Sequence, residues 1–319
     1  MAENIENNNE SINTHIPVLL DECVNLLKID NIIDENVKVF DGTFGGGGYT
    51  NAFLKSDNRV FVTATDLDPY AIQRGNLNFA NEINSHRLTL INSNFAQTVS
   101  TLEDNAYSLI IVDLGFSNNQ LKIDPKGFSY LKTTDLLDLR YNHNQGSPVS
   151  QFLNTASKVE ISKVIYNYSG ETFANRIATK IEEVRGSKPI VTVADLVNII
   201  EISIPQKFRN KKNQILSRVW QSLRIHINDE FTSLETFVNI APTKLKVGGV
   251  LAVINFHSLE DKITTKFMRN LTKPTSEDVY GNKKYDFELI TKKPVVPTLQ
   301  EVERNPQSRS ATLRAIIKL

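Results

Sequence analysis

The chain has 319 residues, of which 36 are Lys or Arg, 36 are Asp or Glu, 40% are hydrophobic and one is Cys. This length suits two domains with a hydrophobic core, and the single cysteine excludes a disulfide scaffold and a cysteine-based zinc cluster and suits a reducing compartment. No apolar run approaches the roughly 18 residues of a membrane span, and residues 1–14, which are acidic and rich in asparagine, predict a disordered tail rather than a signal peptide.

Helices and short strands alternate along the first part of the chain. Apolar residues at helical spacing predict a helix over 18–27. Four apolar, β-branched segments predict buried strands at 37–40, 59–65, 87–91 and 107–113. A helical segment follows each of the first three strands, and Pro69 suits the first position of one of them, with Asp68 as its N-cap. This alternation predicts βαβ units around a parallel sheet.

The alternation stops near residue 125, where a long polar stretch with helical character begins. A single apolar helical stripe follows it, made of Val219, Leu223, Ile227, Phe231, Leu234 and Val238. A buried strand is expected at 248–256, and two extended segments, 285–295 and 310–319, are expected to pair antiparallel at the edge of the sheet. The expected organisation is a doubly wound α/β domain, formed by residues 15–124 and 213–319. A helical insertion, residues 125–212, interrupts it.

A glycine-rich loop joins the first strand to the next helix. Five of the 14 glycines fall between residues 42 and 48. Glycine there lets the backbone turn tightly and lets a ligand approach main-chain N–H groups closely. The loop does not follow G-x-G-x-x-G, and no Lys follows its last glycine as a P-loop requires. A small-molecule site is therefore expected, and a dinucleotide or a nucleoside triphosphate is less favoured as its ligand.

Three carboxylates end strands of the same unit, namely Asp41, Asp66 and Asp113. In open α/β sheets ligands bind outside the carboxyl ends of the strands, so these acids are expected to share one crevice. Asp66 lies 21 residues after Gly45 in the sequence, a separation at which a carboxylate can accept hydrogen bonds from ribose hydroxyls. Asp41 or the loop around Gly45 would hold an amino group, and Asp113 would face the reacting end. The set suits an adenosine ligand without phosphates, and S-adenosylmethionine fits it well.

Ten ordered segments together resemble one family. They are HIPVLLDECV, DGTFGGGGYT, TDLDPYA, DLGFSNNQL, GFSY, LDLRY, YSGETFANRIA, SRVWQSLRIHIN, NFHSLEDKITTKFM and NPQSRSATLRAI, from His15 to the C-terminus. In all of them the chain is similar to the bacterial RsmH (MraW) family, whose members use S-adenosylmethionine to methylate N4 of a cytidine in the decoding region of 16S ribosomal RNA. The resemblance implies a Rossmann-like class I methyltransferase fold with an inserted helical, substrate-recognition domain. It also implies a cytoplasmic enzyme whose partner is 16S rRNA or the small ribosomal subunit.

Motif by motif, the resemblance places cofactor contacts on seven residues. They are Gly47, Gly48, Tyr49, Asp66, Phe95, Asp113 and Gln120. The family usually has His at the position of Tyr49, so the side-chain contact at this position differs from that of the family.

Methyl transfer to an exocyclic amine requires a group that orients the nitrogen and accepts its hydrogen bonds. Asp113 is the candidate, either as the direct acceptor or as a cofactor ligand that leaves this role to a backbone carbonyl. Phe116 is a candidate to stack on a flipped base, with core packing as the alternative. Asn255 and His257, at the end of a strand, are expected to line the nucleobase pocket, unless His257 is bonded within its own turn.

The only cysteine separates two classes of cytosine methylation. Attack at C5 requires a cysteine nucleophile. Cys23 lies on the apolar stripe of the first predicted helix with no proline beside it, so core packing is its expected role. N4 is therefore favoured over C5. The five His residues lack metal-ligand spacing, and no metal is expected.

Basic residues are concentrated in two parts of the chain. Residues 126–224 carry 15 Lys and Arg against eight acids, and residues 262–319 carry 12 against six. Such asymmetry permits an anionic partner that the neutral total conceals. A basic run beside Phe208 is expected to bind phosphate, with a solvated loop as the alternative, and comprises Lys207, Arg209, Lys211 and Lys212. The other candidates for RNA contact are Arg218 and Arg224, which flank Trp220, and Asp138 and Arg140, which are expected in the same cleft.

Two other classes of function stay open at this point. A small-molecule methyltransferase would share the cofactor site but would not need a basic insertion. A non-catalytic RNA-binding or ribosome-assembly factor would retain the fold without binding the cofactor, so Asp66→Ala would change nothing in it. No membrane partner is expected, and a homodimer is one of the oligomeric states that the sequence leaves open.

Overall fold

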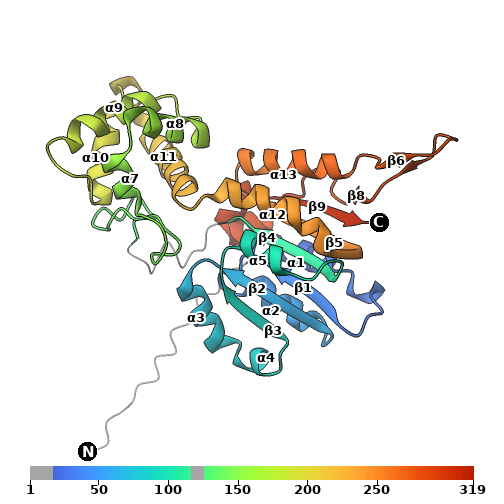
Figure 1. Cartoon of the computed structure of the whole chain (residues 1–319). Coiled ribbons are helices and arrows are strands. Elements are labelled where there is room, and N and C mark those ends of the chain that lie inside the picture. The colour runs from blue at the N-terminus through green and yellow to red at the C-terminus, as the bar shows by residue number, and fades with distance from the viewer. Residues whose placement is uncertain (1–16, 116–125) are drawn as a thin grey trace, which may run out of the picture.

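The fold comes from a computed structural model that describes residues 17–115 and 126–319 (Figure 1). The segment 1–14, for which a tail is expected, lies outside the described residues. Two bodies are visible: a helix-covered sheet, and a separate group of helices formed by the middle of the chain.

The larger body is built on a seven-stranded sheet with the order β3-β2-β1-β4-β5-β9-β8. The strands are β1 (Val37–Asp41), β2 (Val60–Asp66), β3 (Leu88–Asn92), β4 (Tyr107–Asp113), β5 (Leu245–Asn255), β8 (Phe287–Leu289) and β9 (Thr312–Lys318). The first five run parallel, whereas β9 runs antiparallel to both β5 and β8. The expected doubly wound, mostly parallel and Rossmann-like sheet is confirmed. The two C-terminal segments do pair antiparallel, but only β8 is an edge strand, because β9 also pairs with β5.

Helices cover both faces of this sheet. They are α1 (Leu20–Leu26), α2 (Gly48–Ser56), α3 (Pro69–Asn78), α4 (Ala80–Asn84), α5 (Phe95–Thr101), α12 (Glu230–Lys244), α13 (Ser258–Leu271) and α14 (Leu299–Arg304). Because side chains alternate along a strand, Val39 packs in the core with α1 and α2, and its neighbour Phe40 packs in the core with α5 and α12. Cys23 is fully buried in the first of these cores, as expected. Asp68 caps α3 by accepting a hydrogen bond from the Tyr70 N–H at 3.0 Å.

The inserted helices form a second body with a core of its own. They are α7 (Val149–Thr155), α8 (Lys158–Ser169), α9 (Ala174–Arg185), α10 (Val193–Ser203), a 3-10 helix (Gln206–Lys211) and α11 (Lys212–Ile227). Capping boxes begin α8 at Ser157 and α10 at Thr192. The buried side chains of α11, down to Leu223, belong to this core. The apolar core of the insertion therefore extends past residue 212, where the sequence places its end.

The apolar stripe expected as one helix is divided between the two bodies. α11 ends at Ile227 and α12 begins at Glu230, and Asp229 between them has a left-handed φ of 50°. Val219 packs in the core of the insertion, whereas Leu234 packs against the sheet. The pattern continues across the break because both helices bury one face, and the turn decides which body each face joins.

Candidate cofactor and active site

A cavity of about 370 Å³ opens at the carboxyl ends of the parallel strands. The strand order reverses between β1 and β4, and a crevice at such a reversal is the usual ligand site of an open α/β sheet. The glycine loop, Asp66 and Asp113 line the cavity from the sheet, and residues of α12 and of the loop 138–146 close its other side. The volume lies within the range of about 300–1,000 Å³ that small-molecule sites have.

The glycine loop is shaped by positive φ angles and by close packing. Gly45 and Gly47 have φ angles of 54° and 78°, which residues with a side chain rarely adopt. A Cβ on Gly48 would lie 2.2 Å from Pro17 Cγ, so this glycine is required by packing at the start of α2. Gly45 and Gly48 line the cavity, whereas Gly47 packs against the ring of Phe79, and cofactor contact by these glycines stays a prediction.

Asp66 faces the cavity from the end of β2. Its two carboxylate oxygens each accept one backbone N–H, from Gly45 at 2.7 Å and from Asp68 at 2.8 Å. Burial raises the pKa of Asp66 to about 6, although these hydrogen bonds lower it. Because each carboxylate oxygen can accept more than one hydrogen bond, Asp66 keeps acceptor capacity for the vicinal hydroxyls of a ribose.

Asp113 faces the same cavity from the end of β4. Its Oδ1 accepts the Gly115 N–H at 3.0 Å, and its Oδ2 lies 3.2 Å from the hydroxyl of Tyr49. Burial raises the pKa of Asp113 to about 7, with Asp41 and Glu260 adding to the rise. Tyr49 also bonds the carbonyl of Val18, so this side chain ties the N-terminal segment to the acid. Asp113 therefore changes its charge near neutral pH.

Asp41 lies beneath the glycine loop and does not line the cavity. It is 1% exposed, and its oxygens accept the Thr43 N–H at 3.1 Å and the Thr50 hydroxyl at 2.8 Å. Its expected role as a ligand of an amino group is therefore corrected to one of holding the loop in shape. Phe95 does line the cavity and packs edge-on against Phe237. Phe116 and Gln120 lie outside the described residues.

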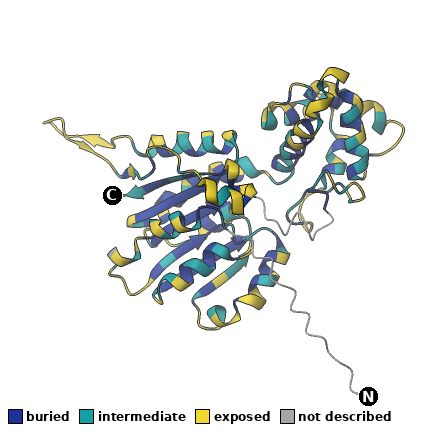
Figure 2. Cartoon of the chain, turned by 180° about the vertical axis from the view of Figure 1, so that it is seen from behind, coloured by how far each residue is buried: buried dark blue, intermediate teal, exposed yellow. Residues whose placement is uncertain are grey.

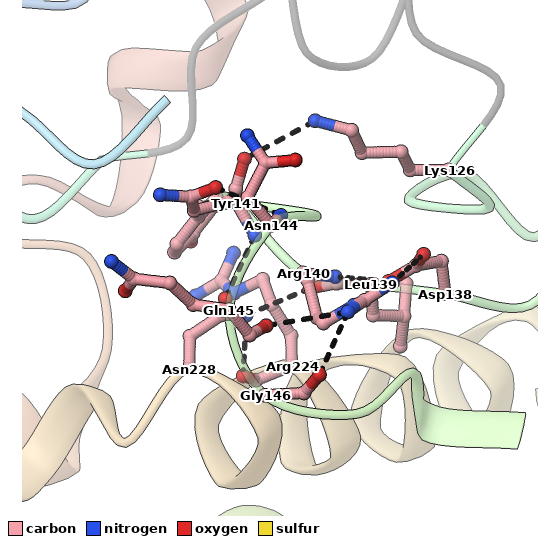
Figure 3. Close-up of polar contacts among 11 residues, drawn as sticks. Lys126, Asp138, Leu139, Arg140, Tyr141, Asn144, Gln145, Gly146, Arg224 and Asn228 are labelled. Atoms are coloured by element: carbon pink, nitrogen blue, oxygen red, sulfur yellow. Dashed lines mark hydrogen bonds and ion pairs between the residues drawn. The ribbon is translucent and has the colours of Figure 1, made fainter. Parts of the chain in front are cut away.

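Arg140 and Asp138 shape the loop 138–146 through contacts with each other and with the loop backbone (Figure 3). Arg140 binds both oxygens of Asp138, through Nε at 2.7 Å and Nη2 at 2.8 Å, and its Nη1 donates to the Gly146 carbonyl at 2.9 Å. Their side chains are only 15% and 19% exposed. Most of their hydrogen bonding is made within the loop, and RNA contact by these two residues stays a prediction.

The loop brings Tyr141 into the cavity beside a buried ion pair. Asn228 fixes the loop by donating to the Leu139 carbonyl at 2.8 Å and accepting the Tyr141 N–H at 2.9 Å. Glu230 accepts from the Tyr141 hydroxyl at 3.1 Å and from Arg224 Nε at 2.9 Å. Burial disfavours the charge of Arg224, but Glu230 raises its pKa above the ordinary value. Arg224 is therefore a cavity residue whose charge is paired with Glu230, and RNA contact by this residue stays a prediction.

Tyr141, Glu230 and Phe256 are site residues that the sequence does not reveal. They come from the insertion, from the start of α12 and from the end of β5 respectively. The left-handed turn at Asp229 brings Glu230 back onto Arg224, and no spacing rule along one helix predicts that contact.

A second cavity of about 260 Å³ adjoins the first and shares Arg224 and Phe256 with it. Its walls are rich in aromatic side chains from both bodies, namely Phe128, Tyr130, Trp220, Phe256 and His257. Trp220 is anchored by its indole N–H, which donates to the Gly127 carbonyl at 2.9 Å.

The structure separates the two residues expected at a nucleobase pocket. His257 lines the second cavity and at the same time caps α13, with its Nε2 2.8 Å from Glu260 Oε1. Asn255 is fully buried in the sheet, where its Oδ1 accepts the Thr264 hydroxyl at 2.8 Å and its Nδ2 donates to the Thr312 carbonyl. The expectation that Asn255 lines a pocket is therefore corrected.

The basic run of the insertion lies at its surface. Lys207, Arg209 and Lys211 are exposed, and none of the three forms an ion pair within residues 17–115 and 126–319. Lys212 instead pairs with Glu201 at 2.9 Å. Arg218 is 43% exposed and lies 3.6 Å from the buried carboxylate of Glu171. RNA contact by these residues stays a prediction.

Among the described residues, no helix is long and apolar enough to cross a bilayer. In the same part of the chain no three His, Cys, Asp or Glu side chains are grouped as metal ligands would be.

Comparison with known proteins gives a consistent result. The model of the MraW methylase family matches residues 12–319. The chain is 37% identical to ribosomal RNA small subunit methyltransferase H of Rickettsia canadensis over 310 residues, which are 95% of this chain and 97% of that protein. It is also 37% identical to the protein of the same name from Rickettsia typhi, over 96% of this chain and 98% of that one. A Streptococcus mutans protein assigned as a methyltransferase and solved with SAH aligns over 96% of this chain and 100% of its own. The TM-score of this alignment is 0.43 and the sequence identity is 14%.

Proposed function

The chain belongs to the MraW methylase family, and from that premise we propose that it transfers a methyl group from S-adenosylmethionine to N4 of a cytidine in 16S ribosomal RNA. The target lies in the decoding region of the small ribosomal subunit, and the enzyme works in the cytoplasm, where subunits are assembled. The observation that carries the proposal is the pair of adjoining cavities: one suits an adenosine cofactor, and the other, walled by aromatic side chains, suits a base.

The first cavity fits S-adenosylmethionine in shape and in charge. Asp66 offers acceptors for ribose hydroxyls, and neither Asp66 nor Asp113 has an ion-pair partner among the described residues. A cationic ligand would offset these buried acids. Arg224 is the only basic side chain among the described lining residues, and Glu230 neutralises it, so a phosphate group has no partner there. The cofactor supplies an electrophilic methyl group on a sulfonium centre.

The second cavity fits a flipped cytosine. Aromatic walls stack on the face of an extruded base and offset the cost of unstacking it. Phe256 lines both cavities. Its ring lies close to Asp113, because a Cβ placed on Gly115 would lie 2.6 Å from the Phe256 ring and 2.8 Å from Asp113 Oδ1. The amine of a base stacked beside Phe256 would therefore approach Asp113. Asp113 as the ionised carboxylate would accept a hydrogen bond from the amine, orient its lone pair and receive its proton.

The position of Cys23 supports N4 over C5. Burial raises the pKa of its thiol well above the ordinary value, and the residue is packed in the core between α1 and the sheet. C5 methylation requires an accessible thiolate. Cys23 cannot serve as one without unfolding this core.

Methyl transfer from labelled S-adenosylmethionine tests the proposal. The substrates are naked 16S rRNA and small subunits from a strain that lacks this modification, and the methylated nucleoside is identified after digestion. The expected product is N4-methylated cytidine, and Asp113→Asn is expected to reduce its formation by about 10²–10⁴-fold, the range of a lost acid–base group.

Other outcomes separate the alternatives. A methyl group on a carbon atom would overturn the proposed mechanism. Cofactor binding without transfer to either RNA would favour a small-molecule methyltransferase, and RNA binding without cofactor binding would favour a non-catalytic assembly factor. Sedimentation of the same preparation tests whether the protein is a homodimer, one of the oligomeric states that the sequence leaves open.

A further inference from the structure

A stripe of basic side chains runs along the outer face of α13. Its members, Lys262, Lys266, Arg269 and Lys273, are all exposed, and we call them the α13 stripe. The spacing of Lys262, Lys266 and Arg269 places them on one side of the helix, in axial steps of about 4.5–6 Å, and Lys273 follows just beyond its last residue, Leu271. The opposite side of α13 buries Thr264 and Met268 against the sheet. The stripe therefore takes no part in packing the core.

The charge of the α13 stripe is not compensated. Within residues 17–115 and 126–319 none of its members forms an ion pair. Asp261 is the acid on this side, and Arg314 of β9 occupies both of its oxygens, through Nε at 2.7 Å and Nη2 at 2.9 Å. A groove of about 580 Å³ runs beside the stripe, and Arg314 lines it as well. The groove is thus lined by more positive than negative charge.

A projecting hairpin continues the surface beyond the end of α13. It consists of β6 (Ser276–Glu277) and β7 (Lys283–Lys284), and Figure 2 shows it exposed along its whole length. Tyr280 between the two strands is 87% exposed. Lys283 and Lys284 are exposed on β7 and form no ion pair in the part of the chain that the structure describes. A two-stranded hairpin gains little stability by itself, and the ring of Tyr280 on it lies outside the packed cores of the molecule.

The position of this surface fits one extended ligand. Both views of the molecule show α13 and the hairpin on the same side of the sheet as the inserted helices (Figures 1 and 2). The second cavity lies between the two regions, since it is lined from α11 of the insertion and from His257 at the start of α13. A polyanion with one nucleotide in that cavity could therefore extend toward the insertion in one direction and along α13 in the other.

We propose that the α13 stripe and the β6–β7 hairpin form a second RNA-binding surface, which holds the phosphate backbone of the ribosomal RNA that flanks the target nucleotide. The inference rests on the proposed function, because it takes the ligand to be the RNA whose base enters the second cavity. The Lys and Arg side chains contact phosphates, which gives affinity without reading sequence. Tyr280 offers a face on which an unpaired base stacks.

The test uses the full chain with K262Q, K266Q, R269Q and K273Q combined. The affinity for 16S rRNA and for small subunits is measured between 50 and 200 mM salt, beside the cofactor affinity and the KM and kcat of methyl transfer. The slope of log affinity against log salt is expected to fall by about 3 and RNA affinity by tenfold or more, since each lost phosphate contact removes about 0.7–0.9 from the slope. KM for RNA should rise, with kcat and cofactor affinity unchanged.

A matched pair of variants separates local contact from net charge. K266Q/R269Q removes two charges from the stripe, and K28Q/K55Q removes two exposed charges from the α1–α2 side. Equal weakening by the two pairs, or an unchanged slope in the combined variant, would overturn the inference and leave the proposed function standing. Tyr280→Ala should weaken RNA binding without changing the slope.

Two further results are informative. Absence of methyl transfer by the unaltered protein would refute the proposed function alone, because the salt dependence is measured without turnover. If the combined variant bound RNA as the unaltered protein does but lost binding to vesicles of anionic phospholipid, the surface would serve a membrane, and the inference would be wrong.

Discussion

At the scale of residues, the cavity is built with carboxylates whose ionised form is disfavoured by burial. Asp66 and Asp113 face the cavity, and Asp41 supports the loop behind it. Each accepts a backbone N–H close to its own strand end, from Asp68, Gly115 and Thr43 respectively. Burial nevertheless raises the pKa of each acid, to between about 6 and 7. The free protein therefore carries protonatable acids where a cationic ligand would favour the ionised forms.

Asp66→Asn is expected to weaken cofactor binding by about 10- to 100-fold. The amide can accept through one atom only, so it loses a charge-assisted hydrogen bond worth about 1.5–3 kcal/mol and leaves a backbone N–H opposite an amide donor. Isothermal titration with S-adenosylmethionine measures the change. Asp68→Asn is the control, because Asn also caps a helix and this residue does not line the cavity. An unchanged affinity in Asp66→Asn would show that the ligand binds elsewhere.

Asp113 is expected to govern the pH dependence of the protein. Its folded pKa of about 7 exceeds the ordinary value of 3.8, so the protonated acid favours folding. That contribution is fully present below about pH 4 and is lost as pH rises through 7, whereas methyl transfer, which needs the carboxylate, should rise over the same range. Asp113→Asn should raise the Tm of the cofactor-free protein at pH 8 and reduce the fall of its Tm between pH 4 and 8, with the remaining fall due to Asp41 and Asp66. A Tm profile identical to that of the unaltered protein would contradict the raised pKa.

At the scale of elements, turns and loops build the site. The glycine loop sets the start of α2, and the left-handed residue between α11 and α12 turns Glu230 onto Arg224. The loop 138–146, held by Arg140, presents Tyr141 to the same pair. These segments carry the site because the helices and strands beside them are fixed by their own cores.

Gly115→Ala tests whether the turn after β4 must keep its close packing against Phe256 and Asp113. Its Cβ would meet the ring of Phe256 at 2.6 Å and Asp113 Oδ1 at 2.8 Å, so one of them must move. We expect a loss of about 1–3 kcal/mol in the free energy of unfolding and at least a tenfold loss of kcat, measured by denaturant titration and methyl transfer. Gly186→Ala is the control, since its backbone is helical and its new Cβ would meet only ordinary contacts. Full activity of Gly115→Ala would show that Phe256 and Asp113 need not keep these positions.

At the scale of the molecule, a neutral chain carries separated charge. The acids outnumber the bases in the first part of the chain, which forms most of the cofactor cavity, and the bases outnumber the acids in the insertion and in the C-terminal part. The two bodies meet at the second cavity, to which the sheet gives His257 and the insertion gives Trp220. The binding of a polyanion and the placement of one of its bases are therefore tasks of the whole chain and not of either body.

Neutralising Lys207, Arg209 and Lys211 to Gln tests the contribution of the insertion. These side chains are exposed, so stability should be unchanged, while the slope of log RNA affinity against log salt should fall by about 2–3. Lys180→Gln, which breaks an exposed ion pair with Glu183, is the control within the same body. An unchanged slope in the triple variant would mean that this run is a solvated loop.

Local pattern predicts much of the fold. The strands that end in Asp41, Asp66 and Asp113 are recognisable because buried parallel strands are short, apolar and β-branched. The glycine loop and the ends of these strands then indicate one ligand site, and Cys23 is recognisable as a core residue because it shares an apolar helical stripe. Ordered motifs along most of the chain indicate the family as well.

The contacts that complete the site depend on the three-dimensional arrangement. The sequence does not show that Arg140 forms an ion pair with Asp138 and that Arg224 forms one with Glu230. Nor does it show that the side chain of Asn255 is buried in the sheet. Sequence spacing reports which face of one element is apolar, since that depends on neighbours a few residues away. It does not report which partner a polar side chain meets across a turn or between two bodies, because burial and pairing there are set by packing of segments far apart in the chain.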